Sequence, residues 1–249
     1  MGYWGVVNNC LKNADLILQI VDARIPKDSI NTEVLRKANL MNKKVVFVFN
    51  KTDLIDEEHL AKLKEKYSES FFVSATKKNT LSPLMKYLNS QADSEKKSLR
   101  VALIGYPNVG KSSILNILAP NANAKVSSVS GTTKETQWIR VGNLRFMDTP
   151  GVISKFDNKV KVGLTASKDV HKLRNPDKVA YEILKVLRKQ NTESLKKFYK
   201  IDFSEKESDY DVLLKVGKSL NYLSKGGEID ENRTVTKIID DWQKGKIKS

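Results

Sequence analysis

The sequence contains few of the residues that build disulfides, metal centres or membrane spans. Cys10 is the only cysteine among 249 residues, which excludes an intramolecular disulfide and argues against a cysteine-based zinc site. The two histidines, His59 and His171, are far apart in the chain, which argues against a histidine-rich metal centre. The longest apolar runs, such as 45–49, are far too short to cross a bilayer. These absences predict a reduced, soluble, cytoplasmic protein without a transmembrane segment.

Basic residues are in clear excess. The chain has 44 lysines and arginines against 29 aspartates and glutamates, a formal net charge of +15. This surplus favours a polyanionic partner such as nucleic acid, although a solvated charged surface is the alternative explanation. Hydrophobic residues make up 40% of the chain, an ordinary fraction for a folded protein.

Strand-like apolar runs alternate with helix-like stretches up to about residue 165, which is typical of α/β proteins with a largely parallel sheet. A polar stretch without apolar periodicity, 89–98, is interpreted as a linker. The expected helices are 31–41, 57–67, 81–88 and 112–118. The expected strands are 16–21, 44–49, 71–73, 100–104 and the two strands of a hairpin, 137–141 and 144–147.

After residue 165 the strand signals stop and apolar residues recur at helical spacing. We therefore expect an α/β domain over 1–165 and a small all-α domain over 166–249. Trp242 continues one of the apolar stripes, which favours a core position over a base-stacking role. The stripes contain Val179, Ile183 and Leu187, then Leu213, Val216 and Leu220, and finally Val235, Ile238 and Ile239.

Residues 105–112, GYPNVGKS, match the phosphate-binding pattern G-x-x-x-x-G-K-[ST] between an expected strand and an expected helix. Glycines let backbone amides wrap a phosphate chain, whereas the alternative is an ordinary glycine-rich turn. Lys111 would contact the terminal phosphates, and the Ser112 hydroxyl would ligate Mg²⁺. The residues expected to hold the nucleotide here are Asn108, Val109, Gly110, Lys111, Ser112 and Ser113.

A second motif, Asn50-Lys51-Thr52-Asp53, follows another expected strand and suits guanine. The Asp53 carboxylate can accept hydrogen bonds from the ring imino group and the exocyclic amine, a donor pair that adenine lacks. The Lys51 stem can cover the base, and Asn50 can brace the loop and reach the base. By itself the tetrapeptide also fits a strand-to-helix turn capped by Asp53. After the next strand, Ser74-Ala75-Thr76 offers a backbone amide to the guanine keto oxygen.

A third motif, Asp148-Thr149-Pro150-Gly151, ends the second hairpin strand downstream of the phosphate loop. Asp148 would hold Mg²⁺ through water, and the Gly151 amide would touch the terminal phosphate. Between the two motifs lies Ser130–Lys134, in which a threonine, Thr133 in preference to Thr132, would complete the Mg²⁺ shell. A plain loop before a strand is the alternative there. The residues expected to carry catalysis are Lys111, Thr133, Asp148 and Gly151.

The base-reading motifs precede the phosphate loop, which reverses the order of an ordinary small GTPase. A chain that is cut and rejoined, here at 89–98, can build the same site. The sequence thereby resembles the circularly permuted P-loop GTPases of ribosome assembly, the YlqF/YawG-type family. The segments that carry the resemblance are Asp22–Pro26 (DARIP), 105–113, Gln137-Trp138 and 241–246 (DWQKGK).

The resemblance implies a circularly permuted GTPase domain that binds GTP, GDP and Mg²⁺. It also implies a helical domain that binds ribosomal RNA, usually on a maturing large subunit, and a potassium ion with Asn108 as its protein ligand. Two features of G proteins are absent: Val152 stands where many have a water-orienting glutamine, and Tyr3-Trp4-Gly5 lacks the histidine of bacterial members. We therefore name no general base and expect slow hydrolysis that potassium and the ribosomal partner stimulate.

The motif at Gly151 leads directly into the expected helical domain, so a phosphate contact there would bias the position of that domain. The predicted function is a monomeric GTPase switch in ribosome assembly. Two alternatives stay open: an RNA-binding scaffold with a non-catalytic nucleotide site, and a GTPase with a non-ribosomal partner. The basic residues expected to grip RNA are Lys155, Lys159, Lys161, Lys168, Lys172 and Arg174, and near the end of the chain Lys244, Lys246 and Lys248.

Overall fold

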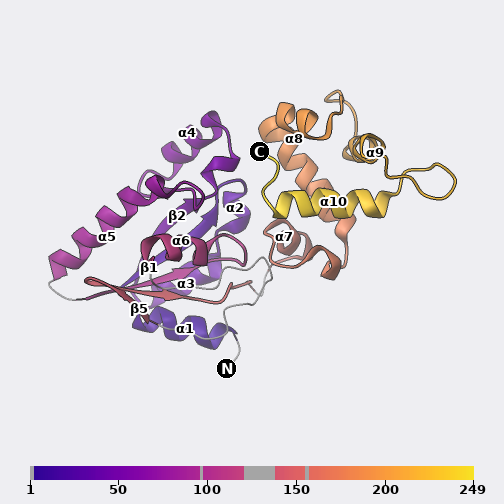
Figure 1. Cartoon of the computed structure of the whole chain (residues 1–249). Coiled ribbons are helices and arrows are strands. Elements are labelled where there is room, and N and C mark those ends of the chain that lie inside the picture. Colours follow the sequence, from indigo (N-terminus) through magenta and orange to yellow (C-terminus); the bar gives the residue numbers. More distant parts are fainter. Residues whose placement is uncertain (1–2, 96–97, 121–137, 155–156) are drawn as a thin grey trace.

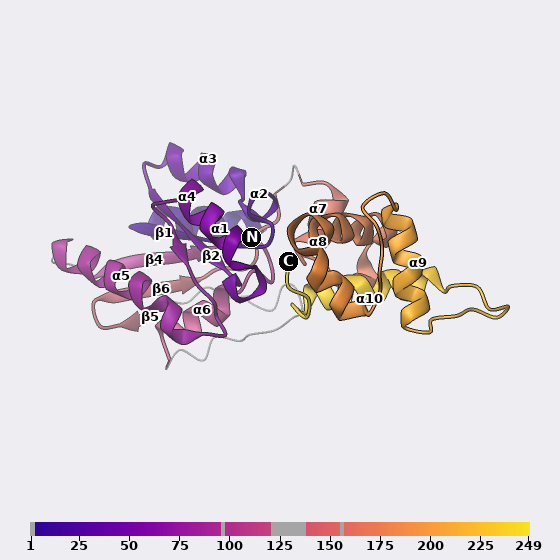
Figure 2. The ribbon, with the colours of Figure 1, turned by 90° about the horizontal axis from the view of Figure 1, so that it is seen from above.

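The computed structural model describes residues 3–95, 98–120, 138–154 and 157–249. It consists of an α/β part, which is built on one sheet, and of a helical part made by helices α7–α10 (Figure 1). The two parts lie side by side in both views, and the C-terminal end of the chain lies between them (Figure 2). In the described ranges, no helix is long and apolar enough to span a bilayer.

The sheet has six strands in the order β3-β2-β1-β4-β6-β5. All neighbouring pairs are parallel except β5 and β6, which form the expected hairpin. The mostly parallel α/β fold is therefore confirmed. Gln137, the first residue of the expected hairpin, lies outside the described residues. The strands are β1 (Leu16–Asp22), β2 (Lys44–Asn50), β3 (Phe71–Phe72), β4 (Leu99–Ile104), β5 (Trp138–Val141) and β6 (Leu144–Asp148).

Helices cover both faces of the sheet, so its central strands are apolar without alternation. In β1, Leu18 and Ile20 pack towards α5 and α6, while Ile17 packs towards α1 and α3. The helices of this part are α1 (Tyr3–Asn13), α2 (Pro26–Ser29), α3 (Thr32–Leu40), α4 (Glu57–Lys66), α5 (Ser82–Glu95) and α6 (Lys111–Leu118). Two 3₁₀ turns, η1 (Thr52–Leu54) and η2 (Lys78–Leu81), complete it.

The linker expected over 89–98 is wrong for most of its length, because α5 continues to Glu95. Leu84, Leu88 and Ala92 recur at helical spacing and are all buried against the sheet. This burial stabilises the helix although the residues between them are mostly polar.

The helical part has its own core, to which every one of its four helices contributes. Helix α7 joins this core through Leu164, so the helical packing begins before the expected boundary at residue 166. Trp242 is completely buried in the same core, which confirms its core role. The helices are α7 (Lys159–Leu164), α8 (Pro176–Tyr199), α9 (Asp209–Ser219) and α10 (Glu231–Gln243), with a 3₁₀ turn η3 (Val170–Lys172).

Candidate nucleotide-binding site

The predicted motifs converge at one edge of the sheet, where the parallel strands have their carboxyl ends. Strand β2 ends at Asn50 and β6 ends at Asp148, while the phosphate loop (residues 105–112) leaves β4. In an open parallel sheet this edge is where ligands bind. Segments that are far apart in the chain therefore form a single site despite the reversed motif order.

Within the phosphate loop, Gly110 is the N-cap of α6 and has a φ of +99°. A Cβ atom at this position would lie 2.2 Å from Asn50 Nδ2, so only glycine fits both the conformation and the space. The first amides of α6 follow directly. A helix N-terminus with free amides attracts phosphate groups, as the sequence motif predicts.

Lys111 is buried under the phosphate loop, where its Nζ donates hydrogen bonds to two carbonyl oxygens of the loop itself. The acceptors are Tyr106 O at 2.8 Å and Gly105 O at 3.2 Å. Burial lowers the pKa of Lys111 to about 8, although the nearby Asp148 charge opposes this shift. A buried ammonium group whose acceptors in the described part of the chain are neutral is well suited to bind an anionic phosphate.

Ser112 and Asp148 come together from two elements, α6 and β6. The Ser112 hydroxyl donates to Asp148 Oδ2 at 2.6 Å, and Asp148 Oδ1 is buried without a hydrogen-bond partner in the part of the chain that the structure describes. Burial raises the pKa of Asp148, since its carboxylate has lost water. An orphaned carboxylate oxygen beside a hydroxyl fits Mg²⁺, a hard cation that also keeps water and phosphate oxygens as ligands.

The remaining residues predicted for the Mg²⁺ site and the switch segment are Thr133, Gly151 and Val152. Thr133 lies outside the described residues. Gly151 lies against the phosphate loop, since a Cβ there would come within 2.6 Å of Pro107 Cα. Val152, at the position of the water-orienting glutamine, is buried in the apolar core and offers no polar group to a water molecule. Among the described residues, no three acidic, histidine or cysteine side chains form a metal cluster.

Asp53 lies in η1, and hydroxyl groups of the neighbouring loop orient both of its carboxylate oxygens. Ser74 Oγ donates to Oδ1 at 2.6 Å, and Thr76 Oγ1 donates to Oδ2 at 3.1 Å. The structure thus brings together three of the residues predicted to form the guanine site. A carboxylate held in this way has fixed acceptor directions for the two donors on the guanine edge.

Asn50 connects the guanine-reading and phosphate-binding loops. Its buried amide donates from Nδ2 to Val109 O at 2.8 Å, and its Oδ1 accepts a hydrogen bond from the Ala75 backbone N–H at 3.0 Å. This contact with both loops agrees with the bracing role predicted for Asn50. The Ala75 amide is thereby engaged with Asn50, and the predicted contact of the Ser74–Thr76 backbone with a guanine keto oxygen stays a prediction.

Two residues of the DARIP segment, Asp22 and Arg24, also belong to the site, although the sequence motifs assigned them no role there. Asp22 ends β1 directly beside Asn50 in the strand register, and Lys51 Nζ lies 2.8 Å from Asp22 Oδ2. Arg24 forms a second ion pair with the same carboxylate, also at 2.8 Å. An acidic residue at the end of the strand next to the Asn50 motif was the available sequence signal.

Comparisons with known proteins match this geometry. The RsgA GTPase family model matches residues 7–158, and the model described as a 50S ribosome-binding GTPase matches residues 100–218. A GTP-binding protein of Methanocaldococcus jannaschii is 36% identical over 97% of this chain and 65% of its own length. Nuclear/nucleolar GTPase 2 of Arabidopsis thaliana is 33% identical over 98% of this chain and 43% of its own. The chain therefore spans about half to two thirds of these curated relatives.

Solved structures agree on the fold. A GDP-bound structure of YlqF superimposes with a TM-score of 0.64 at 20% identity, covering 96% of this chain and 94% of that one. GNP-bound YlqF from T. maritima gives a TM-score of 0.60 at 19% identity, with coverages of 96% and 92%. The RsgA GTPase model spans more than half of the residues of this chain. The chain thus belongs to the RsgA GTPase family, and its motifs stand in the order of a circularly permuted GTPase.

Proposed function

We propose that the protein is a GTP-hydrolysing switch that binds ribosomal RNA on a maturing ribosomal subunit. The large subunit is the favoured partner. The observation that carries this proposal is the bond from Asn50 to Val109, because it holds the guanine-reading and phosphate-binding loops in one site. The family supports hydrolysis of GTP. The cytoplasmic location and the monomeric state stay predictions.

The residues of the site divide the work of binding and hydrolysis. Asp53 selects the guanine edge, and Lys111 donates to the terminal phosphates. Ser112 and Asp148 would hold Mg²⁺, with Thr133 as the proposed third protein contribution, and the ion supplies positive charge where phosphate charge develops. The Gly151 N–H is the proposed donor to the last phosphate. The buried, apolar side chain of Val152 cannot orient a water molecule at this position, which supports a slow intrinsic rate.

Potassium dependence is the first expected result. Asn108 lies in the phosphate loop with a φ of +59°, and its Nδ2 donates to Ala166 O at 2.7 Å. The proposal assigns its carbonyl end to a potassium ion beside the phosphates. We expect GTP hydrolysis to be several-fold faster in potassium than in sodium at equal ionic strength, and Asn108→Gly to remove the difference. Phosphate release at saturating GTP measures both.

We choose glycine at position 108 because it adopts a left-handed φ without strain, so that the substitution removes the side chain and keeps the backbone conformation. Asn42→Gly is the matched control, since Asn42 has a φ of +52° but lies outside the site. Equal rates of the unchanged protein in the two salts, or a potassium effect that survives in Asn108→Gly, would contradict the assignment.

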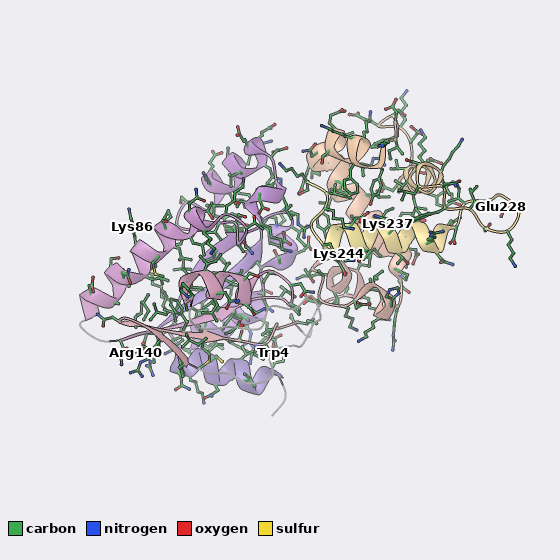
Figure 3. The ribbon with its side chains drawn as sticks, in the orientation of Figure 1. Trp4, Lys86, Arg140, Glu228, Lys237 and Lys244 are labelled. Atoms are coloured by element: carbon green, nitrogen blue, oxygen red, sulfur yellow. The ribbon has the colours of Figure 1, made fainter. Side chains whose placement is uncertain are left out.

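The basic residues expected to contact RNA fall into two groups. Lys161, Lys244 and Lys246 form ion pairs with aspartates, so their charges are largely compensated within the molecule. Figure 3 shows Lys244 near the C-terminal end of α10. Lys155 lies outside the described residues. Five of the expected cations are exposed and have no ion pair with the described residues: Lys159, Lys248 and a set of three that lie close together in the chain between α7 and α8, namely Lys168, Lys172 and Arg174.

These three cations give the second expected result. Ribosomal subunits should carry the protein down in sedimentation, and binding should weaken steeply with salt. Exchanging Lys168, Lys172 and Arg174 for glutamate should reduce the slope of log affinity against log salt by about 2 to 3, about one for each lost phosphate contact. The matched control exchanges three exposed lysines of the α/β part, Lys64, Lys78 and Lys86. Equal slopes in the two triple variants would contradict this RNA surface, and binding to neither subunit would favour a non-ribosomal partner.

A further inference from the structure

We propose that Asp22 and Arg24 are positioning residues that tie the base-recognition loop (residues 50–54) to helix α10, so that guanine binding and docking of the helical part are coupled. The proposal rests on the proposed guanine nucleotide site. It differs from a switch that senses the last phosphate, because it concerns the base. It therefore predicts a response to GDP as well as to GTP.

The first of the contacts between the base-recognition loop and α10 is the ion pair of Lys51 with Asp22. Lys51 adopts a left-handed conformation, with a φ of +66°, at the start of η1. Its Nζ is held by Asp22 Oδ2 at 2.8 Å, so the side chain lies along the end of β1 and its aliphatic stem is kept in one direction. Because Asp53 follows within the same turn, the position of the Lys51 backbone also sets where the guanine-reading carboxylate lies.

The second contact passes from Asp22 to the helical part through Arg24. The guanidinium group binds both carboxylate oxygens, with Nη2 at 2.8 Å from Oδ2 and Nε at 3.1 Å from Oδ1. Its remaining nitrogen, Nη1, donates to Trp242 O at 2.8 Å, and its Cζ atom lies 3.9 Å from the centre of the indole ring. Arg24 is completely buried, so one planar group joins β1 to α10.

The charges of the three residues make this connection stiff. Burial by itself would raise the pKa of Asp22, but the charges of Arg24 and Lys51 hold the pKa well below its ordinary value. One carboxylate thus serves two cations, and movement of either cation leaves buried charge uncompensated. Breaking a buried pair is strongly unfavourable, so the loop and α10 are expected to move together.

A separate contact joins the C-terminal end of the base-recognition loop, at Leu54, to the helical part. The Ser249 backbone N–H donates to Leu54 O at 2.8 Å, and a Cβ at Gly245 would lie 2.8 Å from Leu54 Cδ1. The segment after α10 therefore packs directly on η1. Asp53 lies between Lys51 and Leu54 in the chain, so the loop is linked to the helical part on both sides of the guanine-reading residue.

A double-mutant cycle on GDP affinity tests the proposal. Trp242→Phe keeps an aromatic core residue but alters the ring stacked on Arg24, and Lys51→Met cuts the connection at Asp22 while keeping a stem over the base. We expect Trp242→Phe to weaken GDP binding about fivefold or more, within the usual range of coupling between sites. In the Lys51→Met background the same change should have no further effect. Calorimetry with GDP measures all four affinities.

Ile238→Val is the matched control, because Ile238 is fully buried on the same helix and belongs to the same core, while its aliphatic side chain offers Arg24 neither a hydrogen bond nor a π face. The proposal is overturned if Trp242→Phe leaves the affinity for GDP unchanged, if Ile238→Val lowers it equally, or if the two changes are additive. If the unchanged protein does not bind GDP at all, the nucleotide site itself is wrong, and that failure is distinct.

Should Trp242→Phe fail to fold, the tryptophan itself becomes the probe. In a Trp4→Phe, Trp138→Phe background, Trp242 is the only tryptophan of the chain. Its emission should change on saturation with GDP and should not change in the same background with Lys51→Met at saturating GDP. An unchanged emission in the first protein, or an equal response in both, overturns the proposal.

Discussion

Lys111→Ala is expected to lower kcat/KM for GTP hydrolysis at least about 100-fold, the usual effect of removing one group that stabilises charge in a transition state. The phosphate loop holds this lysine beneath itself, and the acceptors that its Nζ reaches among the described residues are the neutral carbonyls of Gly105 and Tyr106. Phosphate oxygens are stronger acceptors for a charged donor than these carbonyls. Multiple-turnover phosphate release measures the effect. The same measurement separates an enzyme from an RNA-binding scaffold with a non-catalytic nucleotide site. Such a scaffold would show no turnover that Lys111→Ala could remove, and it would bind ribosomal subunits equally well with and without this substitution.

The same substitution should leave the fold intact, which makes the loss specific. Because burial lowers the pKa of Lys111 to about 8, the folded protein binds fewer protons than the unfolded chain between about pH 8 and pH 10.5. Its contribution to the free energy of unfolding therefore rises with pH in this window, and the rise should be smaller in Lys111→Ala. Thermal unfolding without nucleotide at pH 8 and pH 10 measures this. Lys86→Ala, at an exposed position on α5, should change neither activity nor this pH dependence.

Local patterns were sufficient to predict the strands and the motifs. All six strands were expected, because runs such as LILQIV and KVVFVF are too apolar for any exposed element and too short for buried helices. Helix α1 was missed, although Val7, Cys10, Leu11 and Ala14 are buried at helical spacing. Asparagines interrupt that stripe in the sequence and weaken the signal. The end of α5 was missed because the residues around Ala92 are mostly polar, and this one buried alanine gives too weak an apolar pattern to indicate a helix.

Contacts between distant residues could not be predicted from the same patterns. The Asn50 motif predicts that this residue braces its loop and reaches the base, but the hydrogen bond to Val109 depends on the strand order and on the lack of a side chain at Gly110. The pairing of Arg24 with Trp242 joins residues from opposite ends of the chain. A charge run also hides its partners, which is why Lys161 was expected to face RNA although it pairs with Asp157.

Asp53→Asn is expected to reverse the base preference of the site. The carboxylate accepts from two donors on the guanine edge, whereas an amide offers one acceptor and one donor. Guanine then meets a donor facing a donor, and xanthine, which has an oxygen in place of the exocyclic amine, becomes complementary. GDP affinity should fall by about 10⁴-fold, as expected where a site loses the groups that read its ligand. Xanthosine diphosphate should become the tighter ligand, and calorimetry with both nucleotides measures the exchange.

The control is Asp56→Asn, the same chemical change at the next carboxylate along the chain. Asp56 caps α4 by accepting the His59 N–H at 2.7 Å, and asparagine caps helices about as well as aspartate. This variant should therefore keep the guanine preference and the stability of the unchanged protein. Ser74 and Thr76 donate to Asp53 through hydroxyls, and a hydroxyl can rotate to accept a hydrogen bond from an amide nitrogen, so the variant loop is expected to stay folded. Retained GDP affinity in Asp53→Asn would show that another residue reads the base, and the assignment of the guanine site would fall with it.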